Sequence, residues 1–169
     1  ILQSLKQDAD CALERGVTSA RPMVLAAVRI AREKGATTIQ LDDISKKKEG
    51  GKIFKLANMS FLTSGQTWYQ SIIPGLRPLT NEAKIARWRM IVLSNTWKDV
   101  AERLAEQGVP AVGEVFVRGI DVTAPGSAMD VLRRIKEART TFFDDYGDEL
   151  LVASRIGSLY GESWTAPLD

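Results

Sequence analysis

The sequence predicts a mixed α/β (α+β) fold, in which a helix-and-strand part is followed by a mainly helical extension. Apolar residues at helical spacing lead to Gly35, and the β-branched stretch TTIQL follows directly. After residue 78, two capping boxes open long stretches with helical periodicity. We therefore place the α/β part at residues 1–78 and the helical extension at residues 79–169, either as two domains or within one compact domain.

The first part of the chain contains two predicted helices. Leucines and alanines three and four residues apart indicate an amphipathic helix at residues 2–16. A second helix is predicted from Ser19, its N-cap, to residue 34, with Pro22 in the first turn and Gly35 as the stop. We expect this helix to pack on a sheet through an apolar face that is made of Met23, Ala27 and Ile30.

Two strands are predicted after the second helix. The first spans residues 37–41 and points Ile39 and Leu41 to one side. The polar segment DDISKKKEGGK is predicted to be a loop, and IFKL at residues 53–56 a short strand. The lysine run 46–48 fits a solvated loop better than a phosphate site.

The extension is predicted to be mostly helical. Helices are expected at residues 80–95 and 96–108 and from Ser127 onward, with a strand at 114–122 and a break near Gly147. The arginines of this half are diluted by acidic residues, which indicates solvated helix faces. An acidic group is interpreted as a helix junction; it consists of Asp144, Asp145, Asp148 and Glu149.

The composition excludes several classes of protein. With 169 residues, 44% of them hydrophobic, the chain is long enough to bury a core. A net charge of +2 argues against a nucleic-acid partner. The one cysteine, Cys11, cannot form an internal disulfide and suits a reducing compartment, and no apolar run is long enough for a membrane span. We therefore expect an intracellular, cytoplasmic protein.

The sequence contains no histidine, and this restricts its chemistry. Without an imidazole there is no Ser-His-Asp or Cys-His nucleophile pair, and the commonest zinc ligand is missing. Asp42 and Asp43 lack a third carboxylate at fixed spacing, so no metal site is predicted. The remaining carboxylates, tyrosines, lysines and backbone amides suit reactions in which a cofactor carries most of the reactivity.

The stretch SFLTSGQTWYQSIIPGLRP, Ser60–Pro78, has the densest run of unusual residue types. Trp68 and Tyr69 fit a packing role on a short helix that caps a sheet, between Gly65 and a Pro74-Gly75 turn. An active or binding role is the alternative. We expect Trp68 to be more buried than Tyr69, since only the tyrosine has a reason to face a cleft.

Together with GATTIQLDDIS and IFKLANM, this stretch resembles the C-terminal half of a divergent GNAT-type N-acetyltransferase fold. The form it resembles is found in proteins of large double-stranded DNA viruses. The resemblance covers about residues 18–78. The residues that carry it are Leu41, Asp43, Ser45, Gly65, Thr67, Trp68, Tyr69, Gly75, Leu76 and Pro78.

The resemblance implies a catalytic and a cofactor-binding site. Tyr69 would be the general acid that protonates the thiolate leaving acyl-CoA. The CoA pyrophosphate would bind backbone N–H groups at a helix N-terminus, where Arg15, Gly16 and Arg21 are the cofactor-binding residues. The segment ERGVTSARP has a single glycine, however, and Pro22 provides no N–H group.

Two functional classes follow from this pattern. The first is a GNAT-like protein that has lost acyl-CoA chemistry, binds no cofactor and serves as an interaction or structural component with other protein subunits. Such a protein would be virion-associated if it is viral. The second is an acetyl-CoA-dependent N-acetyltransferase.

Overall fold

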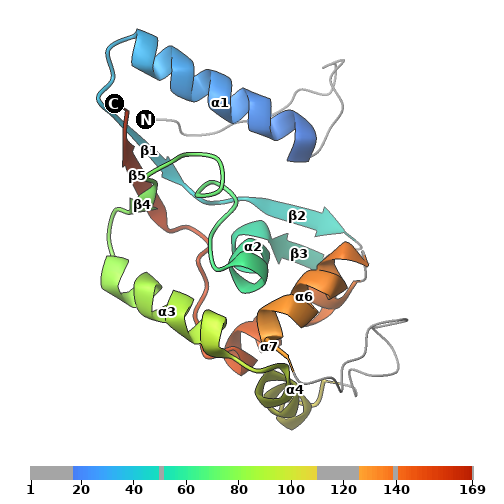
Figure 1. Ribbon diagram of the computed structural model, residues 1–169. Coiled ribbons are helices and arrows are strands. Elements are labelled where there is room, and N and C mark those ends of the chain that lie inside the picture. The colour runs from blue at the N-terminus through green and yellow to red at the C-terminus, as the bar shows by residue number, and fades with distance from the viewer. Residues whose placement is uncertain (1–16, 50–51, 110–125, 139–140, 169) are drawn as a thin grey trace. The chain divides into compact units, whose positions relative to one another are not determined.

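The computed structural model describes residues 17–49, 52–109, 126–138 and 141–168 (Figure 1). These residues form six helices and two small antiparallel sheets, so the predicted mixed fold class is confirmed. The helix predicted at residues 2–16 and the strand predicted at 114–122 lie outside the described residues.

The chain divides into two compact units, and each is described by itself. The first comprises Ile1–Asp43, Tyr69–Glu82 and Gly161–Asp169. The second comprises Ile44–Trp68 and Ala83–Tyr160. Both units are therefore built from segments that are distant in sequence.

A three-stranded antiparallel sheet forms the centre of the first unit (Figure 1). Its strands are β1 (Thr38–Asp42), β5 (Ser163–Pro167) and the two-residue β4 (Arg77–Pro78), in the order β1-β5-β4. Leu41 pairs with Trp164, and Ile39 with Ala166. All four side chains are buried, so Ile39 and Leu41 share the core side of the sheet as predicted.

Helix α1 (Val17–Glu33) precedes this sheet in the chain. It begins two residues before Ser19, which is therefore not its N-cap, and Pro22 lies in the second turn rather than the first. The helix ends before Gly35, whose φ of 79° confirms the predicted stop.

The predicted apolar face of α1 is only partly correct. Met23 and Ala27 are half-buried, but Ile30 is 51% exposed, and the most buried side chain is Val24. The buried stripe includes Val24, Ala27 and Val28, which lie at i, i+3 and i+4. It is thus rotated by one position from the predicted face.

A β-hairpin opens the second unit and corrects the predicted loop. Strand β2 (Lys46–Glu49) pairs with β3 (Lys52–Lys55), and Glu49 lies opposite Lys52. The two residues between these strands in the sequence are glycines, a pair that two-residue hairpins favour. The lysine run is therefore a strand rather than a loop.

Helix α2 (Leu56–Ser64) follows β3 directly. It ends at Gly65, which has a left-handed φ of 72° and donates its N–H to the Phe61 carbonyl at 2.8 Å. The side of α2 that is buried carries Asn58 among its apolar residues.

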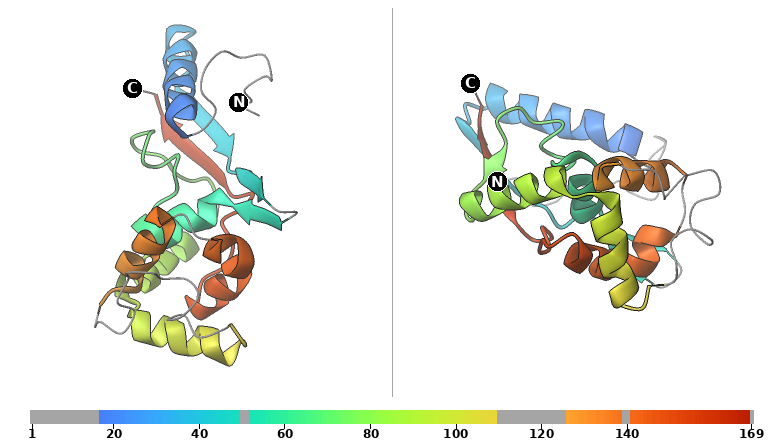
Figure 2. Two further views of the ribbon diagram at one scale, coloured as in Figure 1. Left: turned by 90° about the vertical axis from the view of Figure 1, so that its right-hand side faces the viewer. Right: turned by 60° about the horizontal axis from the view of Figure 1, so that its bottom comes forward.

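Among its described residues, the second unit has four further helices (Figure 2). They are α3 (Glu82–Ser94), whose first residue belongs to the first unit, α4 (Trp97–Glu106), α6 (Ala128–Glu137) and α7 (Phe142–Ala153). Helices α2 and α4 each pack against both α6 and α7. The core between them includes Trp97, Leu104, Leu132, Ile135 and Leu150.

The predicted capping boxes mark both helix starts, but only one makes its side-chain bond. The hydroxyl of Thr96 accepts a hydrogen bond from the Asp99 N–H at 3.2 Å, whereas Ser127 makes no such bond. The predicted break near Gly147 is confirmed at Tyr146, whose φ of −132° and ψ of 23° are non-helical, so that two helical segments meet at a kink within α7. The separation of α6 from α7 before Phe142 was not predicted.

Candidate functional site

The Trp68-Tyr69 stretch forms turns rather than the short helix expected from the sequence. The Tyr69 carbonyl accepts hydrogen bonds from the N–H groups of Ile72 and Ile73, at 3.0 and 2.8 Å. A second turn is closed by the Leu76 N–H, with Pro74 and Gly75 at its corner and a φ of 73° at the glycine. The predicted Pro74-Gly75 turn is thus confirmed.

Tyr69 lies in a partly desolvated and negatively charged environment. Trp68 and Tyr69 are both half-buried, so the expected contrast in their burial is not seen. Burial, and second the negative charge of Asp43, raise the pKa of Tyr69 above its ordinary value of 10.0. Asp43 is fully buried at the end of β1, where its carbonyl accepts the Gly161 N–H at 2.8 Å. The phenol is therefore protonated at neutral pH.

The three predicted cofactor-binding residues lie at the start of α1 or before it. Arg15 and Gly16 are outside the described residues, and Arg21 is exposed in the second turn of the helix. Because α1 begins at Val17, the N–H groups at its start that have no partner within the helix all precede residue 20. Pro22 is not among them, so it removes no donor from that end.

A pocket of about 170 Å³ lies in the second unit between α2 and α7. Its apolar lining residues are Met59, Leu62 and Phe143. The α7 wall carries the four carboxylates of the acidic group that the sequence analysis interpreted as a junction. No group of three or more potential metal ligands occurs within the described ranges.

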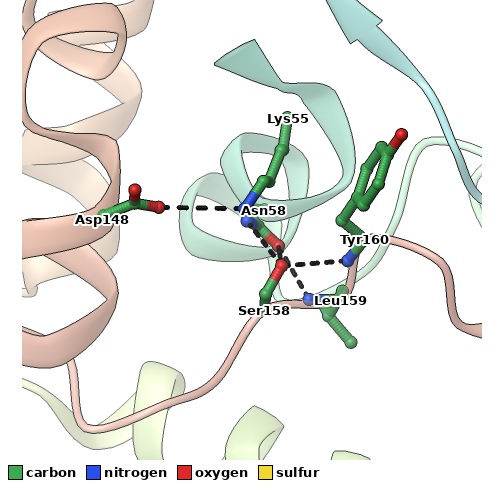
Figure 3. Close-up of polar contacts among 6 residues, drawn as sticks. All are labelled: Lys55, Asn58, Asp148, Ser158, Leu159 and Tyr160. Carbon is green, nitrogen blue, oxygen red and sulfur yellow. Dashed lines mark hydrogen bonds and ion pairs between the residues drawn. The ribbon is translucent and has the colours of Figure 1, made fainter. Parts of the chain in front are cut away.

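Asn58 connects this pocket to the segment that follows α7 (Figure 3). Asn58 is 6% exposed, and its side-chain carbonyl oxygen accepts a hydrogen bond from the Leu159 N–H at 2.8 Å. Its amide donates to the Ser158 hydroxyl at 3.2 Å, and that hydroxyl accepts the Tyr160 N–H at 3.2 Å. The Asn58 side chain therefore holds two consecutive residues of an irregular segment, and the Ser158 hydroxyl extends the network to a third.

Lys55 is the basic side chain at the pocket. Its Nζ lies 3.9 Å from the Asp148 carboxylate and 5.8 Å from the centre of the Tyr160 ring (Figure 3). One lysine beside four carboxylates leaves the lining negative, which favours cationic groups over anions such as CoA phosphates.

An exposed apolar seam runs along α3, and the sequence analysis did not identify it. The α3 seam consists of Ala83, Ala86, Met90 and Leu93, all exposed. Met90 is 67% and Leu93 is 50% exposed. The sequence indicates the seam only in that apolar residues occur on both sides of α3. The structure is needed to show which side is buried and which is exposed.

The other side of α3 is buried within the protein. Ile85 and Val92 are buried there, and the Trp88 ring covers Gly157 so closely that a Cβ at that glycine would lie 2.7 Å from a ring carbon. The Lys84 ammonium lies 4.8 Å from the centre of the same ring. The exposed seam is therefore the second apolar face of a helix that is already packed.

No family model, curated protein or solved structure matches this chain. Among the described residues, no helix is long and apolar enough to cross a membrane.

Proposed function

We propose that this chain is a non-catalytic interaction or structural component, a GNAT-like protein that has lost acyl-CoA chemistry and contacts another protein subunit through the α3 seam. The exposure of Met90 and Leu93 carries this proposal. Large apolar side chains that gather on one exposed face mark interaction sites, whereas single exposed residues need no explanation.

The packing of α3 supports this proposal. A helix at the surface of a globular unit usually has one apolar stripe, which faces the core. Helix α3 meets that need with Ile85 and Val92, so folding of the unit does not require Met90, the most exposed residue of the seam, to be apolar. A partner that covers them gives a physical reason for their apolar character.

A photo-crosslinking experiment tests this function. Benzoylphenylalanine replaces Met90 in the full chain, which is irradiated in the cells that produce it. Val152, which is 65% exposed on α7, is the matched control position. We expect one defined protein adduct from position 90 and none from position 152. Equal labelling at both positions, or none at position 90, refutes the proposal.

Calorimetry with acetyl-CoA tests the loss of cofactor chemistry. We expect no binding up to millimolar ligand, because the segment before α1 has a single glycine and the described pocket is acidic. Binding in the low micromolar range, worth about 8 kcal/mol, overturns this part of the proposal.

The alternative function is an acetyl-CoA-dependent N-acetyltransferase with Tyr69 as general acid. Tyr69 is protonated at neutral pH, as a proton donor must be, although burial and the charge of Asp43 raise its pKa and make it a weaker acid than an ordinary phenol. Under this alternative, Tyr69→Phe abolishes turnover and leaves acetyl-CoA affinity unchanged.

A further inference from the structure

We propose that the occupant of the α3 seam is an amphipathic helix of a different protein, with acidic residues beside its apolar positions. This inference rests on the proposed function and specifies the chemistry of the partner. Three observations on α3 support this inference. They are the spacing of the seam residues, the charges at the borders of the seam and the poor charge match between two copies of α3.

The seam has the spacing of a helix-pairing surface. Its four residues follow one another at intervals of three, four and three, which is the a/d pattern of two heptads. At 1.5 Å per residue, the seam is roughly 15 Å long. The two alanines allow a close approach at one end, and Met90 and Leu93 provide large knobs at the other. A helix fits such a straight and narrow strip.

The borders of the seam are mainly basic. Arg87 lies on one side and Arg89 on the other, and both are exposed. Neither forms an ion pair within the part of the chain that the structure describes. Glu82 is the one acidic residue at the borders. Aspartate or glutamate at the flanking positions of the partner would pair with the two arginines.

A second copy of α3 fits this surface poorly. The middle of the seam is at residue 88, so antiparallel pairing brings Arg87 and Arg89 opposite their own counterparts. Like charges at that position oppose association. Parallel pairing brings Glu82 beside Arg87 of the second copy but places Arg89 beside Ser94, so one arginine of each copy stays without a carboxylate. The charges therefore favour a different protein.

Synthetic peptides test this inference against the full chain by fluorescence anisotropy. The probe is a labelled three-heptad peptide with leucine at a and d and glutamate at e and g. One control peptide has the same composition in scrambled order, and a second has lysine in place of every flanking glutamate. We expect micromolar binding of the acidic heptad peptide and at least tenfold weaker binding of both controls.

Variants of the chain locate the binding. Met90→Ser weakens binding of the acidic peptide at least tenfold, whereas the matched Val152→Ser leaves it unchanged. Combining Arg87→Glu with Arg89→Glu makes the lysine peptide the tighter ligand. Circular dichroism confirms that each variant is folded.

Three results overturn the inference. Equal binding of the scrambled peptide shows charge attraction without helix pairing. Dimerisation in sedimentation equilibrium that Met90→Ser abolishes identifies a second copy as the occupant. No binding of the acidic peptide while position 90 still crosslinks to a protein refutes the acidic helix and leaves the proposed function standing.

Discussion

Replacing Asn58 with alanine should destabilise the second unit far more than removing its hydrogen-bond partner Ser158. Asn58 is buried in α2, and its carbonyl is the acceptor for the buried Leu159 N–H at 2.8 Å. Alanine cannot accept this bond, and water cannot easily reach the N–H group. The Ser158 side chain, by contrast, is exposed, so water can replace the hydroxyl that Ser158→Ala removes.

The expected loss in the free energy of unfolding follows from these hydrogen bonds. A buried N–H without an acceptor costs about 1–3 kcal/mol, and the bond to the Ser158 hydroxyl contributes about 0.5–1.5 kcal/mol. Asn58→Ala should therefore lower the free energy of unfolding by about 2–4 kcal/mol. Ser158→Ala should lower it by about 1 kcal/mol or less.

Urea denaturation followed by far-ultraviolet circular dichroism measures both values. Amide hydrogen exchange at Leu159 provides a local readout, and we expect faster exchange in Asn58→Ala than in Ser158→Ala. If the two variants unfold at the same urea concentration, or if Leu159 exchanges equally slowly in both, the anchoring role assigned to Asn58 is wrong.

Three further changes test other contacts. Gly157→Ala places a Cβ 2.7 Å from the indole ring that covers it, and should lower the free energy of unfolding in urea by about 1–3 kcal/mol. Asp43→Asn should lower the pKa of Tyr69 in a spectroscopic titration, with Tyr69→Phe as the blank, because the charge of Asp43 raises that pKa. Since folding raises this pKa, its contribution to stability is complete below about pH 10 and is lost as the pH rises further. Thr96→Ala should cost about 1 kcal/mol in urea denaturation and Ser127→Ala less, because only Thr96 makes the side-chain cap bond; equal costs would contradict this.

Local signals predicted much of the secondary structure. Gly35 and Gly65 end helices with positive φ, and Thr96 caps α4, because these effects depend on a few neighbouring residues. Strand β5 was missed because it lies at the other end of the chain from its partner β1. Its pairing places Trp164 in the core, and nothing local to that tryptophan indicates a sheet.

The hairpin shows a different reason for failure. Its lysines were assigned to a loop on composition, although the glycine pair at residues 50–51 separates two runs of a length that suits strands. Charged residues are tolerated in strands that face solvent, so polarity alone does not exclude a sheet. The turn residues were the stronger signal.

The candidate site depends on contacts that the sequence does not contain. The acidic residues of α7 form a pocket wall only because α2 brings Met59 and Leu62 opposite them. The sequence shows Asn58 only as a polar residue among apolar ones, because the N–H group that it accepts belongs to Leu159, 101 residues later. The role of Tyr69 as a general acid stays a prediction. The structure shows that burial and the charge of Asp43 raise the pKa of its phenol.

In helix α3, one apolar side is explained by burial in the fold, and the other can be identified only from the structure. Ile85 and Val92 are seven residues apart, a spacing that puts them on one side of a helix, and both side chains are buried in the structure. The same periodicity cannot assign Met90 and Leu93, because a helix with apolar residues on two sides has two possible core faces. Once one face is packed in the unit, the other faces water, where it contributes little to folding and is available for burial in a complex. The function proposed for the chain therefore rests on the residues that its own fold leaves uncovered.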